Sequence, residues 1–417
     1  MVVDAPDPAN LRSARTIRML YWTREAFPTF RVDLDILFGR ELLGRGHAID
    51  FVMQAASTRI APGAHSWCGR TVFVGPTAEG GPLSAFLRHL RAFWHDLKSL
   101  HLARRRNYDA IQFRDKFIIA AIGVLVARAR RLKLFYWLSF PYPEDDRLRA
   151  SLRLTRYPRF VKLRGAVTAW LLYRWILPHA DYIFVQSARM KADIGAQRIS
   201  SEKMVPVPMG IDLNDIQTEP FGASEPGTDI VLGYLGALNA DRHIEMLVDM
   251  LAHLQVDRPA VRLLLVGDAF NRADHEALLQ RAQQHGVLGR LEITGSLPRA
   301  DALRRMRAVH IALSPYYPTP TLLSTSPTKL VEYLALGIPV VASEHPEQRL
   351  ILRESGAGVC APWGARYFAR SVRWLLRQGP ETLAEMGSRG RSWVQHYRTY
   401  SRIADDLEAT YINLLSA

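Results

Sequence analysis

The sequence predicts an α/β protein built from two doubly wound domains, and three observations support that fold class. Apolar runs of strand length alternate with helical patterns almost throughout the chain, which is typical of βαβ units around buried parallel sheets. These alternations form two series, separated by a polar segment rich in Pro and Gly at residues 211–229. The 417 residues, 48% hydrophobic and 23% charged, are enough for two or three globular domains of roughly 100–200 residues each.

The first series follows residues 1–15, which we expect to form a flexible tail, and it defines a domain at residues 16–210. Helical patterns in this domain include residues 83–105 and 116–132. The predicted strands lie at residues 17–22, 48–54, 71–74, 110–113, 134–138 and 182–186.

The second series follows the expected linker at residues 211–229 and defines a domain at residues 230–396. The chain then ends in a helix predicted at residues 397–417, which we expect to pack back toward the first domain. The predicted strands of the second domain lie at residues 230–235, 261–266, 291–294, 310–314, 340–342 and 358–360.

Ligands of open parallel sheets bind beyond the carboxyl ends of the strands, where the strand order reverses. Two Rossmann-like sheets in one chain therefore predict an active site in a central cleft between the domains. Neither a GxxxxGK[ST] phosphate loop nor a GxSxG nucleophile turn occurs, so P-loop hydrolysis and serine esterase chemistry have no support.

Several classes of protein are excluded by composition and local sequence. The first fifteen residues contain no apolar stretch, so no secretory signal is expected. The longest uncharged apolar runs, at residues 117–127 and 165–173, fall short of the ~20 residues that span a bilayer. Cys68 and Cys360 lack a partner motif, which indicates a reducing compartment and no zinc site. We therefore expect a soluble or peripheral cytoplasmic protein.

The charge is concentrated in one half of the chain. Residues 1–215 contain 33 Lys and Arg against 19 Asp and Glu, whereas residues 216–417 contain 21 of each. The formal net charge of +14 therefore belongs to the first half, and it points to a polyanionic partner there.

A basic, aromatic stretch at residues 147–174 favours an anionic membrane surface as that partner. It contains eight Lys or Arg and no acidic residue, interleaved with Leu, Val, Phe, Tyr and Trp, and each basic residue adds on the order of 1 kcal/mol to binding an anionic bilayer. The helical pattern at residues 86–106, which ends in three arginines, extends the basic region. A solvated charged face is the alternative. No recognised nucleic-acid module occurs, so nucleic acid is not an expected partner.

The most informative segment is SPTKLVEYLALGIPVVAS at residues 326–343. Pro327, behind Ser326 as a cap, starts a short helix, and Gly337 ends it. The N-terminus of a helix binds anions through its free N–H groups and its dipole, and Lys329 adds a full positive charge there. Glu332, one turn further, can accept hydrogen bonds from a vicinal diol such as a ribose.

This segment resembles the donor-binding region of the retaining GT-B glycosyltransferases, in particular glycosyltransferase family 4. Other segments resemble that family in the same order along the chain. They are GYLGAL at 233–238 followed by Arg242, LLLVGDA at 263–269, LEITGSLP at 291–298, HIALSPY at 310–316, and, in the first half, FVQSARMK at 184–191 and VPVPMGID at 205–212.

The resemblance implies a transferase that moves a hexose from a nucleotide diphosphate sugar with retention at the anomeric carbon, without a metal or another cofactor. It assigns Glu332 to the ribose and Arg242 and Lys329 to the diphosphate, and these three residues are the catalytic candidates. The implied donor-binding residues are Gly233, Gly236, Ser324, Thr325, Ser326, Thr328, Lys329 and Glu332.

The chain also departs from the family pattern. Of the two family glutamates, which are separated by seven intervening residues, the second matches Glu332, but Ser324 occupies the position of the first. Ala237 replaces a basic residue after the glycine turn, and the region YWLSFPYPEDD at 136–146 lacks the family histidine. Two alternatives therefore remain: a nucleotide-sugar 2-epimerase on the same scaffold and a non-catalytic, glycosyltransferase-like binding subunit.

The first domain is the expected acceptor-binding domain. Its charge suggests a saccharide or lipid-linked saccharide at the inner face of the cytoplasmic membrane, as in polysaccharide or lipopolysaccharide biosynthesis. Arg31, and Asp145 and Asp146 in a predicted loop after a strand, are the acceptor-side candidates. Asp33 and Asp35 lie in a helical pattern that predicts both carboxylates at the solvent, and no metal site is expected from them.

Overall fold

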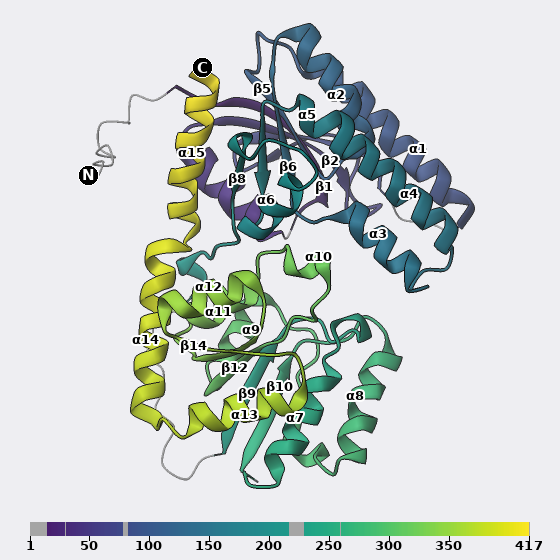
Figure 1. Cartoon of the computed structure of the whole chain (residues 1–417). Coiled ribbons are helices and arrows are strands. Elements are labelled where there is room, and N and C mark those ends of the chain that lie inside the picture. The colour runs from purple at the N-terminus through teal and green to yellow at the C-terminus, as the bar shows by residue number, and fades with distance from the viewer. Residues whose placement is uncertain (1–14, 30, 78–81, 217–228, 259, 417) are drawn as a thin grey trace. The chain divides into compact units, whose positions relative to one another are not determined.

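The structure is a computed structural model that describes residues 15–29, 31–77, 82–216, 229–258 and 260–416. It divides into two compact units, residues 1–207 with 400–417, and residues 208–399 (Figure 1). Each unit is built on a sheet of mostly or entirely parallel strands with helices on both faces, which confirms the predicted fold class. The chain enters the second unit at Pro208, three residues before the predicted linker begins, and residues 217–228 of that linker and 1–14 of the predicted tail lie outside the described residues.

The first unit contains an eight-stranded sheet in the order β3-β4-β2-β1-β5-β6-β7-β8. All neighbouring strands run parallel except β3 and β4, which form an antiparallel pair. The strands are β1 Arg18–Phe27, β2 Ala48–Ala55, β3 Gly63–Trp67, β4 Arg70–Gly75, β5 Ala110–Arg114, β6 Lys133–Leu138, β7 Tyr182–Val185 and β8 Met204–Pro206.

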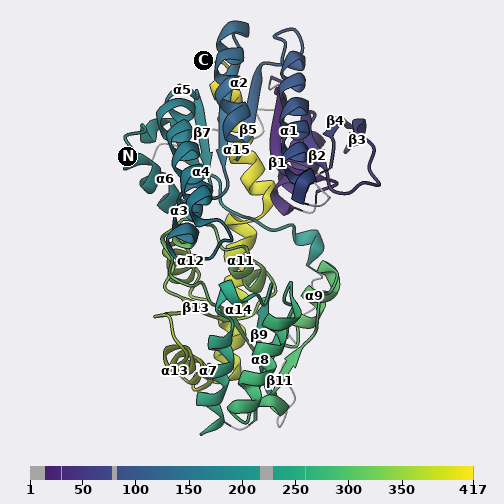
Figure 2. The ribbon, with the colours of Figure 1, turned by 90° about the vertical axis from the view of Figure 1, so that its right-hand side faces the viewer.

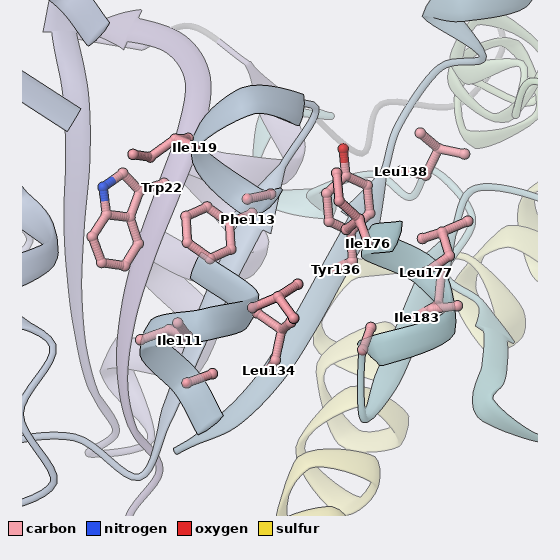
Figure 3. Packing of buried hydrophobic residues seen from close by; sticks show 14 of the residues in the cluster. Trp22, Ile111, Phe113, Ile119, Leu134, Tyr136, Leu138, Ile176, Leu177 and Ile183 are labelled. Atoms are coloured by element: carbon pink, nitrogen blue, oxygen red, sulfur yellow. The ribbon is translucent and has the colours of Figure 1, made fainter. Parts of the chain in front are cut away.

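Helices cover both faces of this first sheet. The described helices are η2 Asp33–Leu42, α1 Pro82–Ser99, η3 Leu100–Leu102, α2 Phe117–Arg130, α3 Tyr142–Ser151, α4 Pro158–Trp170, η4 Leu171–Ile176, α5 Leu177–His179, α6 Ala188–Gly195, η5 Ser201–Lys203 and α15 Tyr400–Ser416. On one face, side chains of α2, η4 and α5 pack on Trp22, Phe113 and Tyr136 of the strands (Figure 3). The opposite face is covered by η2 and α15.

Helix α15 belongs to the first unit although it ends the chain (Figure 1). Its apolar side chains Ile403, Leu407 and Leu415 are buried against that sheet. The phenol of Tyr411 donates a buried hydrogen bond of 2.6 Å to the Gln112 side chain on β5. The helix begins at Tyr400, three residues after the predicted start, because α14 extends to Tyr397.

The second unit contains a six-stranded, fully parallel sheet in the order β11-β10-β9-β12-β13-β14. Its strands are β9 Ile230–Leu235, β10 Val261–Val266, β11 Leu291–Ile293, β12 Ile311–Ser314, β13 Val340–Ser343 and β14 Gly358–Ala361. Its helices are η6 Leu213–Asp215, η7 Ala240–Arg242, α7 Glu245–Gln255, α8 Arg272–Gln284, η8 Leu288–Arg290, α9 Arg299–Met306, α10 Pro320–Leu323, α11 Thr328–Ala335, α12 Pro346–Ser355, α13 Ala365–Leu376 and α14 Pro380–Tyr397.

The strand order of the second sheet reverses between β9 and β12. From β9 the chain steps outward through β10 to β11, whereas β12, β13 and β14 extend the sheet on the other side. The carboxyl ends of β9 and β12 therefore flank the crevice in which a doubly wound sheet binds its ligands. Residues 236 and 316 follow these two strands.

The structure differs from the sequence prediction mainly at polar or short elements. Strands β3 and β8 were not predicted, because β3 is largely exposed and has no apolar run, and β8 is three residues long and ends in a proline. The basic stretch 147–174 is divided between α3, α4 and η4. In the part of the chain that the structure describes, no helix is long and apolar enough to cross a membrane.

Candidate functional site in the second unit

Lys329 lies directly on Gly236, which follows β9 at the point where the strand order of the second sheet reverses. A Cβ atom added to Gly236 would come within 2.3 Å of Lys329 Cε and 2.7 Å of its Nζ. Gly236 also has a φ angle of +146°, which L side chains rarely adopt. The glycine therefore provides both the turn at the end of β9 and the space that the lysine occupies.

Two tyrosine rings flank the ammonium group of Lys329. Its Nζ lies 5.0 Å from the ring centroid of Tyr234 at the end of β9 and 5.9 Å from that of Tyr316 after β12. Among the described residues, none gives this ammonium a hydrogen bond or a carboxylate ion pair. The aromatic faces supply partial negative charge to the ammonium, while its three hydrogen-bond donors stay available.

Electrostatics around Lys329 favour the arrival of an anion. Burial is the main cause that lowers the pKa of Lys329; Tyr316 opposes that shift, and the nearby charge of Arg242 adds to it. Arg242 is exposed at the end of the short helix η7. Its positive charge also opposes the rise in the pKa of Tyr234 that burial causes. An anion placed beside both cations would remove their mutual repulsion and replace the hydration that Lys329 lost.

Helix α11 starts beside this lysine, and its cap differs from the prediction. Pro327 occupies the N-cap position, and no side chain caps the helix. Ser326 was expected to do so, but its hydroxyl accepts a hydrogen bond from Met209 N and donates one to Glu347 Oε1, both of 2.9 Å. Thr328 and Lys329 therefore form a first turn whose backbone N–H groups receive no side-chain cap, which suits an anion.

Glu332 lies one turn further along α11, and it is buried. Its Oε1 atom is engaged by Arg299 Nη1 at 2.5 Å, from the start of α9. The sequence suggested neither this partner nor its consequence, which is that one carboxylate oxygen is already occupied. A ribose contact by Glu332 would therefore use Oε2 or share the carboxylate with Arg299.

Tyr333 fixes α11 to the end of β9. Its phenol oxygen accepts a hydrogen bond of 2.8 Å from Leu235 N, beyond the point where the pairing between β9 and β12 has ended. The sequence analysis gave no site role to Tyr333, Tyr234 or Tyr316. The available signal was that Tyr234 and Tyr316 lie within motifs already recognised, GYLGAL and HIALSPY.

The remaining predicted donor-binding residues have structural contacts of their own. Gly233 lies inside β9, where an added Cβ would come within 2.2 Å of Val309 Cγ2, so core packing explains this glycine. Ser324 is buried, and its hydroxyl donates to Pro320 O at 3.4 Å. The Thr325 hydroxyl donates to Leu322 O at 2.7 Å. These contacts hold the segment between α10 and α11 in shape.

Residues at the start of helix α12 form hydrogen bonds with the segment between α10 and α11. His345 Nε2 lies 3.0 Å from Leu322 O, and its Nδ1 accepts a hydrogen bond of 3.2 Å from Glu347 N, so the ring is neutral with its proton on Nε2. Burial lowers the pKa of His345 to about 4. The buried Glu347 also pairs with Arg398 at 2.8 Å, whose carbonyl accepts from Ile211 N at 2.9 Å.

In the first unit, the acceptor-side candidate Arg31 is half-buried and belongs to a cluster of ion pairs. It lies 3.2 Å from Asp33 and 3.5 Å from Glu25. The prediction of a solvent-facing Asp33 is wrong, because this carboxylate is buried and pairs at 2.7 Å with the fully buried Arg114 at the end of β5. Burial alone would raise the pKa of Asp33, but Arg114 and Arg31 hold it below its usual range.

The other two acceptor-side candidates lie on a helix. Asp145 and Asp146 were predicted in a loop, but they occupy the first half of α3, whose first turn contains Pro143. Asp146 accepts two hydrogen bonds from Arg164 on α4, of 2.8 and 2.7 Å, which braces α3 against α4. Across the described ranges, no three His, Cys, Asp or Glu residues cluster as metal ligands would.

Comparison with known proteins decides the family. The model of the glycosyl transferases group 1 matches residues 215–393, and that of glycosyltransferase family 4 matches residues 37–215. The chain is a GT-B glycosyltransferase-fold protein of the family 4 group. The two family models meet at residue 215, close to the start of the second unit at residue 208.

Curated relatives match over part of their length. The chain is 25% identical over 217 residues to a D-inositol 3-phosphate glycosyltransferase of Segniliparus rotundus. The aligned region covers 50% of this chain and 47% of the relative. It is 29% identical over 162 residues to a phosphatidyl-myo-inositol mannosyltransferase of Mycobacterium leprae, which covers 38% of this chain and 40% of the relative. The chain thus spans about half the length of the curated relatives that it matches.

Solved structures resemble the fold over nearly the whole chain. Sucrose-phosphate synthase from Thermosynechococcus elongatus superposes with a TM-score of 0.72 at 17% identity, covering 96% of this chain and 100% of that one. Anabaena HepE in complex with UDP superposes with a TM-score of 0.66 at 16% identity, covering 94% and 99%. At these identities the likeness establishes the fold and nothing beyond it.

Proposed function

We propose that this chain is a retaining glycosyltransferase that moves a hexose from a nucleotide diphosphate sugar to a saccharide or lipid-linked saccharide. The observation that carries the proposal is the placement of Lys329 on Gly236, beside the uncapped start of α11 and between Tyr234 and Tyr316. A cation, free backbone N–H groups and a missing side chain converge where a doubly wound sheet binds nucleotides.

In this proposal the chemical task of the second unit is to stabilise the leaving diphosphate. Negative charge develops on the diphosphate as the bond to the sugar breaks, and Lys329, Arg242 and the α11 dipole are already fixed in place to receive it. Protein cations can carry that role, so neither a metal nor another cofactor is part of the proposal. The acceptor hydroxyl would attack on the face that the diphosphate leaves, which needs no side-chain base.

Glu332 would recognise the ribose hydroxyl groups of the nucleotide. The carboxylate is buried and held by Arg299, and a fixed carboxylate oxygen discriminates well between a ligand that has the matching hydroxyl and one that lacks it. Support for a uridine donor comes from HepE, whose solved complexes contain UDP and UDP-glucose.

The first unit would bind the acceptor, with Arg31, Asp145 and Asp146 as candidates for that side. Its excess of positive charge suits an anionic or lipid-linked acceptor at the inner face of the cytoplasmic membrane. The named relatives act on an inositol phosphate and a phosphatidylinositol, which supports an acceptor that carries phosphate or lipid. Polysaccharide or lipopolysaccharide assembly is the proposed setting.

The test is donor binding followed by transfer. Thermal-shift measurements across UDP, GDP, ADP and their sugars should identify one nucleotide that stabilises the protein, by about 2.7 kcal/mol at a hundredfold excess over its Kd. Glu332→Ala and Arg242→Ala should lose most of that stabilisation, whereas Arg366→Ala, an exposed arginine of the same unit, should not.

The outcome of the transfer assay separates the alternatives. Release of product only when an acceptor is present supports the transferase. Turnover of the sugar nucleotide without any acceptor would indicate an epimerase. Stabilisation by no nucleotide, with unchanged activity of a host complex in the Glu332→Ala variant, would indicate a binding subunit.

A further inference from the structure

Helix α4 exposes an apolar stripe that the proposed chemistry does not use. Phe160, Leu163, Val167 and Trp170 follow one another at spacings of three, four and three residues, which places them on one side of a helix. Their side chains are 64%, 63%, 50% and 62% exposed. We call these four residues the α4 stripe.

The neighbouring helices continue the apolar surface. On α1, Phe86, Leu90 and Trp94 are exposed at helical spacing, and on α2, Ile118 and Leu125 are exposed. Helices α1, α2 and α4 lie on the same side of the first unit (Figures 1 and 2). All exposed large apolar side chains among the described residues of this unit lie on α1, α2 or residues 152–170.

Unpaired basic residues surround the stripe. Residues 147–174 contain eight Lys or Arg and no acid, and Arg164 forms an ion pair there, with Asp146. Arg149, Arg153, Arg159 and Lys162 form no ion pair with any described residue. Exposed aromatic and aliphatic side chains mixed with unpaired cations are typical of elements that lie in the interface of an anionic bilayer.

A basic hollow opens at the carboxyl end of the stripe. Arg174 follows Trp170 by one helical turn, and it lines a hollow of about 370 Å³ together with Arg198, Ser200 and Lys203. The Lys203 ammonium donates to the carbonyls of Leu177, Pro178 and Ala180. Its three N–H groups are therefore occupied, and it contributes only its positive charge to the hollow. The guanidinium groups of Arg174 and Arg198 form no hydrogen bond or ion pair with any described residue.

We propose that the α4 stripe rests in the surface of an anionic bilayer while Arg174 and Arg198 hold the phosphate of one lipid headgroup. Two guanidinium groups match the oxygens of a phosphate, and the stripe places acyl chains next to it. The occupant is a bilayer lipid rather than a second copy of this chain, because an apposed copy would bring the same unpaired cations together. This inference rests on the peripheral location proposed above and is independent of the donor site.

Vesicle co-sedimentation of the full chain tests the inference. We expect binding to vesicles of phosphatidylcholine with phosphatidylglycerol, weaker binding at high salt, and little binding to pure phosphatidylcholine. Phe160→Ser combined with Trp170→Ser should weaken binding at least tenfold. Arg174→Gln combined with Arg198→Gln should remove the preference for anionic vesicles, and Val256→Ser, which changes an exposed apolar residue of the second unit, should bind as the unchanged protein does.

A competition experiment and a measurement of oligomeric state distinguish a bilayer lipid from a soluble phosphate and from a second copy of the chain. Soluble glycerol phosphate should compete poorly, because it lacks the acyl chains that contact the stripe; full competition would overturn the bilayer lipid as occupant. Equal, salt-insensitive binding to neutral vesicles, or unchanged binding by the stripe variant, would also overturn the inference. So would a dimer that the stripe variant dissociates while the unchanged protein ignores vesicles. Nucleotide-induced thermal shifts should stay the same in all variants, so a failure of the donor proposal would be seen separately.

Discussion

Lys329 shows how much of the candidate site depends on a single side chain. It is the only lysine between residues 208 and 399, a region that otherwise carries its full positive charges on arginines. Arginine is broader and planar, whereas lysine presents a compact charge on a thin stem. The stem of Lys329 lies against Gly236, and this position therefore suits lysine better than the broader arginine.

Replacement of this lysine should separate binding from stability. Lys329→Met should weaken nucleotide diphosphate binding by about tenfold to a hundredfold, the range expected for one charge-assisted hydrogen bond. Stability without ligand should not fall, because the buried ammonium, whose pKa is lowered by burial, is costly to keep charged. Lys329→Arg should bind as poorly as Lys329→Met. Calorimetric titration and chemical denaturation measure the two effects, and binding at the original affinity by either variant would contradict the assignment.

Gly236 should be as sensitive as the lysine that it faces. Gly236→Ala should displace Lys329, since the new Cβ would lie 2.3 Å from Cε, and should cost about 1–3 kcal/mol of unfolding free energy for its φ angle. Gly289→Ala, with open space around the new Cβ, should change neither property. Normal nucleotide affinity in Gly236→Ala would show that Lys329 is not where the diphosphate binds.

At the scale of elements, α12 holds the segment between α10 and α11 through buried polar contacts. His345 contacts Leu322 and the backbone of Glu347, and Glu347 contacts Ser326 and Arg398. These contacts join α11 to Met209 and Ile211, near the start of the second unit, and to its last residues. The segment between α10 and α11, which we propose to face the nucleotide, is thereby held in place by His345, Glu347 and Arg398.

This support should make stability depend on pH through His345. Its folded-state pKa of about 4 lies below the ordinary value of 6.5, so the unfolded chain takes up a proton first as the pH falls. The contribution of the neutral His345 ring to the free energy of unfolding is therefore complete above pH ~6.5. As the pH falls toward ~4, the free energy of unfolding decreases by about 3 kcal/mol through this residue. Urea denaturation of His345→Gln and the unchanged protein across this range measures the difference, because the other histidines contribute equally to both. Parallel pH profiles would show that folding leaves the pKa of His345 unchanged, which would contradict this account.

The elements could be predicted where burial decides them. Strands β9 and β10 match their predicted bounds, because a buried parallel strand is a continuous apolar run. Strand β3 escaped prediction, since Gly63 and Ser66 are exposed on an antiparallel edge strand. In the site, Lys329 and Glu332 could be recognised from one local motif. Arg299 could not be connected to Glu332, because that pair joins α9 to α11 through the fold.

On the scale of the whole molecule, the chain returns at its end to complete the first unit. Leu407 on α15 is buried in that core, whereas Asn413 on the same helix is exposed. Leu407→Ala should lower the stability of the first unit by about 2–5 kcal/mol, and Asn413→Ala should have little effect. Hydrogen exchange should quicken in β1, β5 and β6 and stay unchanged in β9 and β10. Equal quickening in both sheets would contradict the assignment of α15 to the first unit.

The uneven charge is the second property of the whole molecule. The second half is neutral overall and contains the candidate donor site, whereas the excess of positive charge belongs to the first half. In the neutral half, Lys329 and Arg242 are the cations beside the candidate site, whereas the basic half attracts anionic partners over longer distances. We therefore expect the affinity for the donor to change little with salt concentration, apart from the screening of these two cations.

A crystal structure of the chain with its preferred nucleotide diphosphate is the most direct measurement of the central claim. We predict that the β-phosphate lies within hydrogen-bond distance of Lys329 Nζ and of the first backbone N–H groups of α11, with the ribose against Glu332. A nucleotide bound elsewhere, with Lys329 still enclosed by Tyr234 and Tyr316 and no phosphate beside it, would contradict the account.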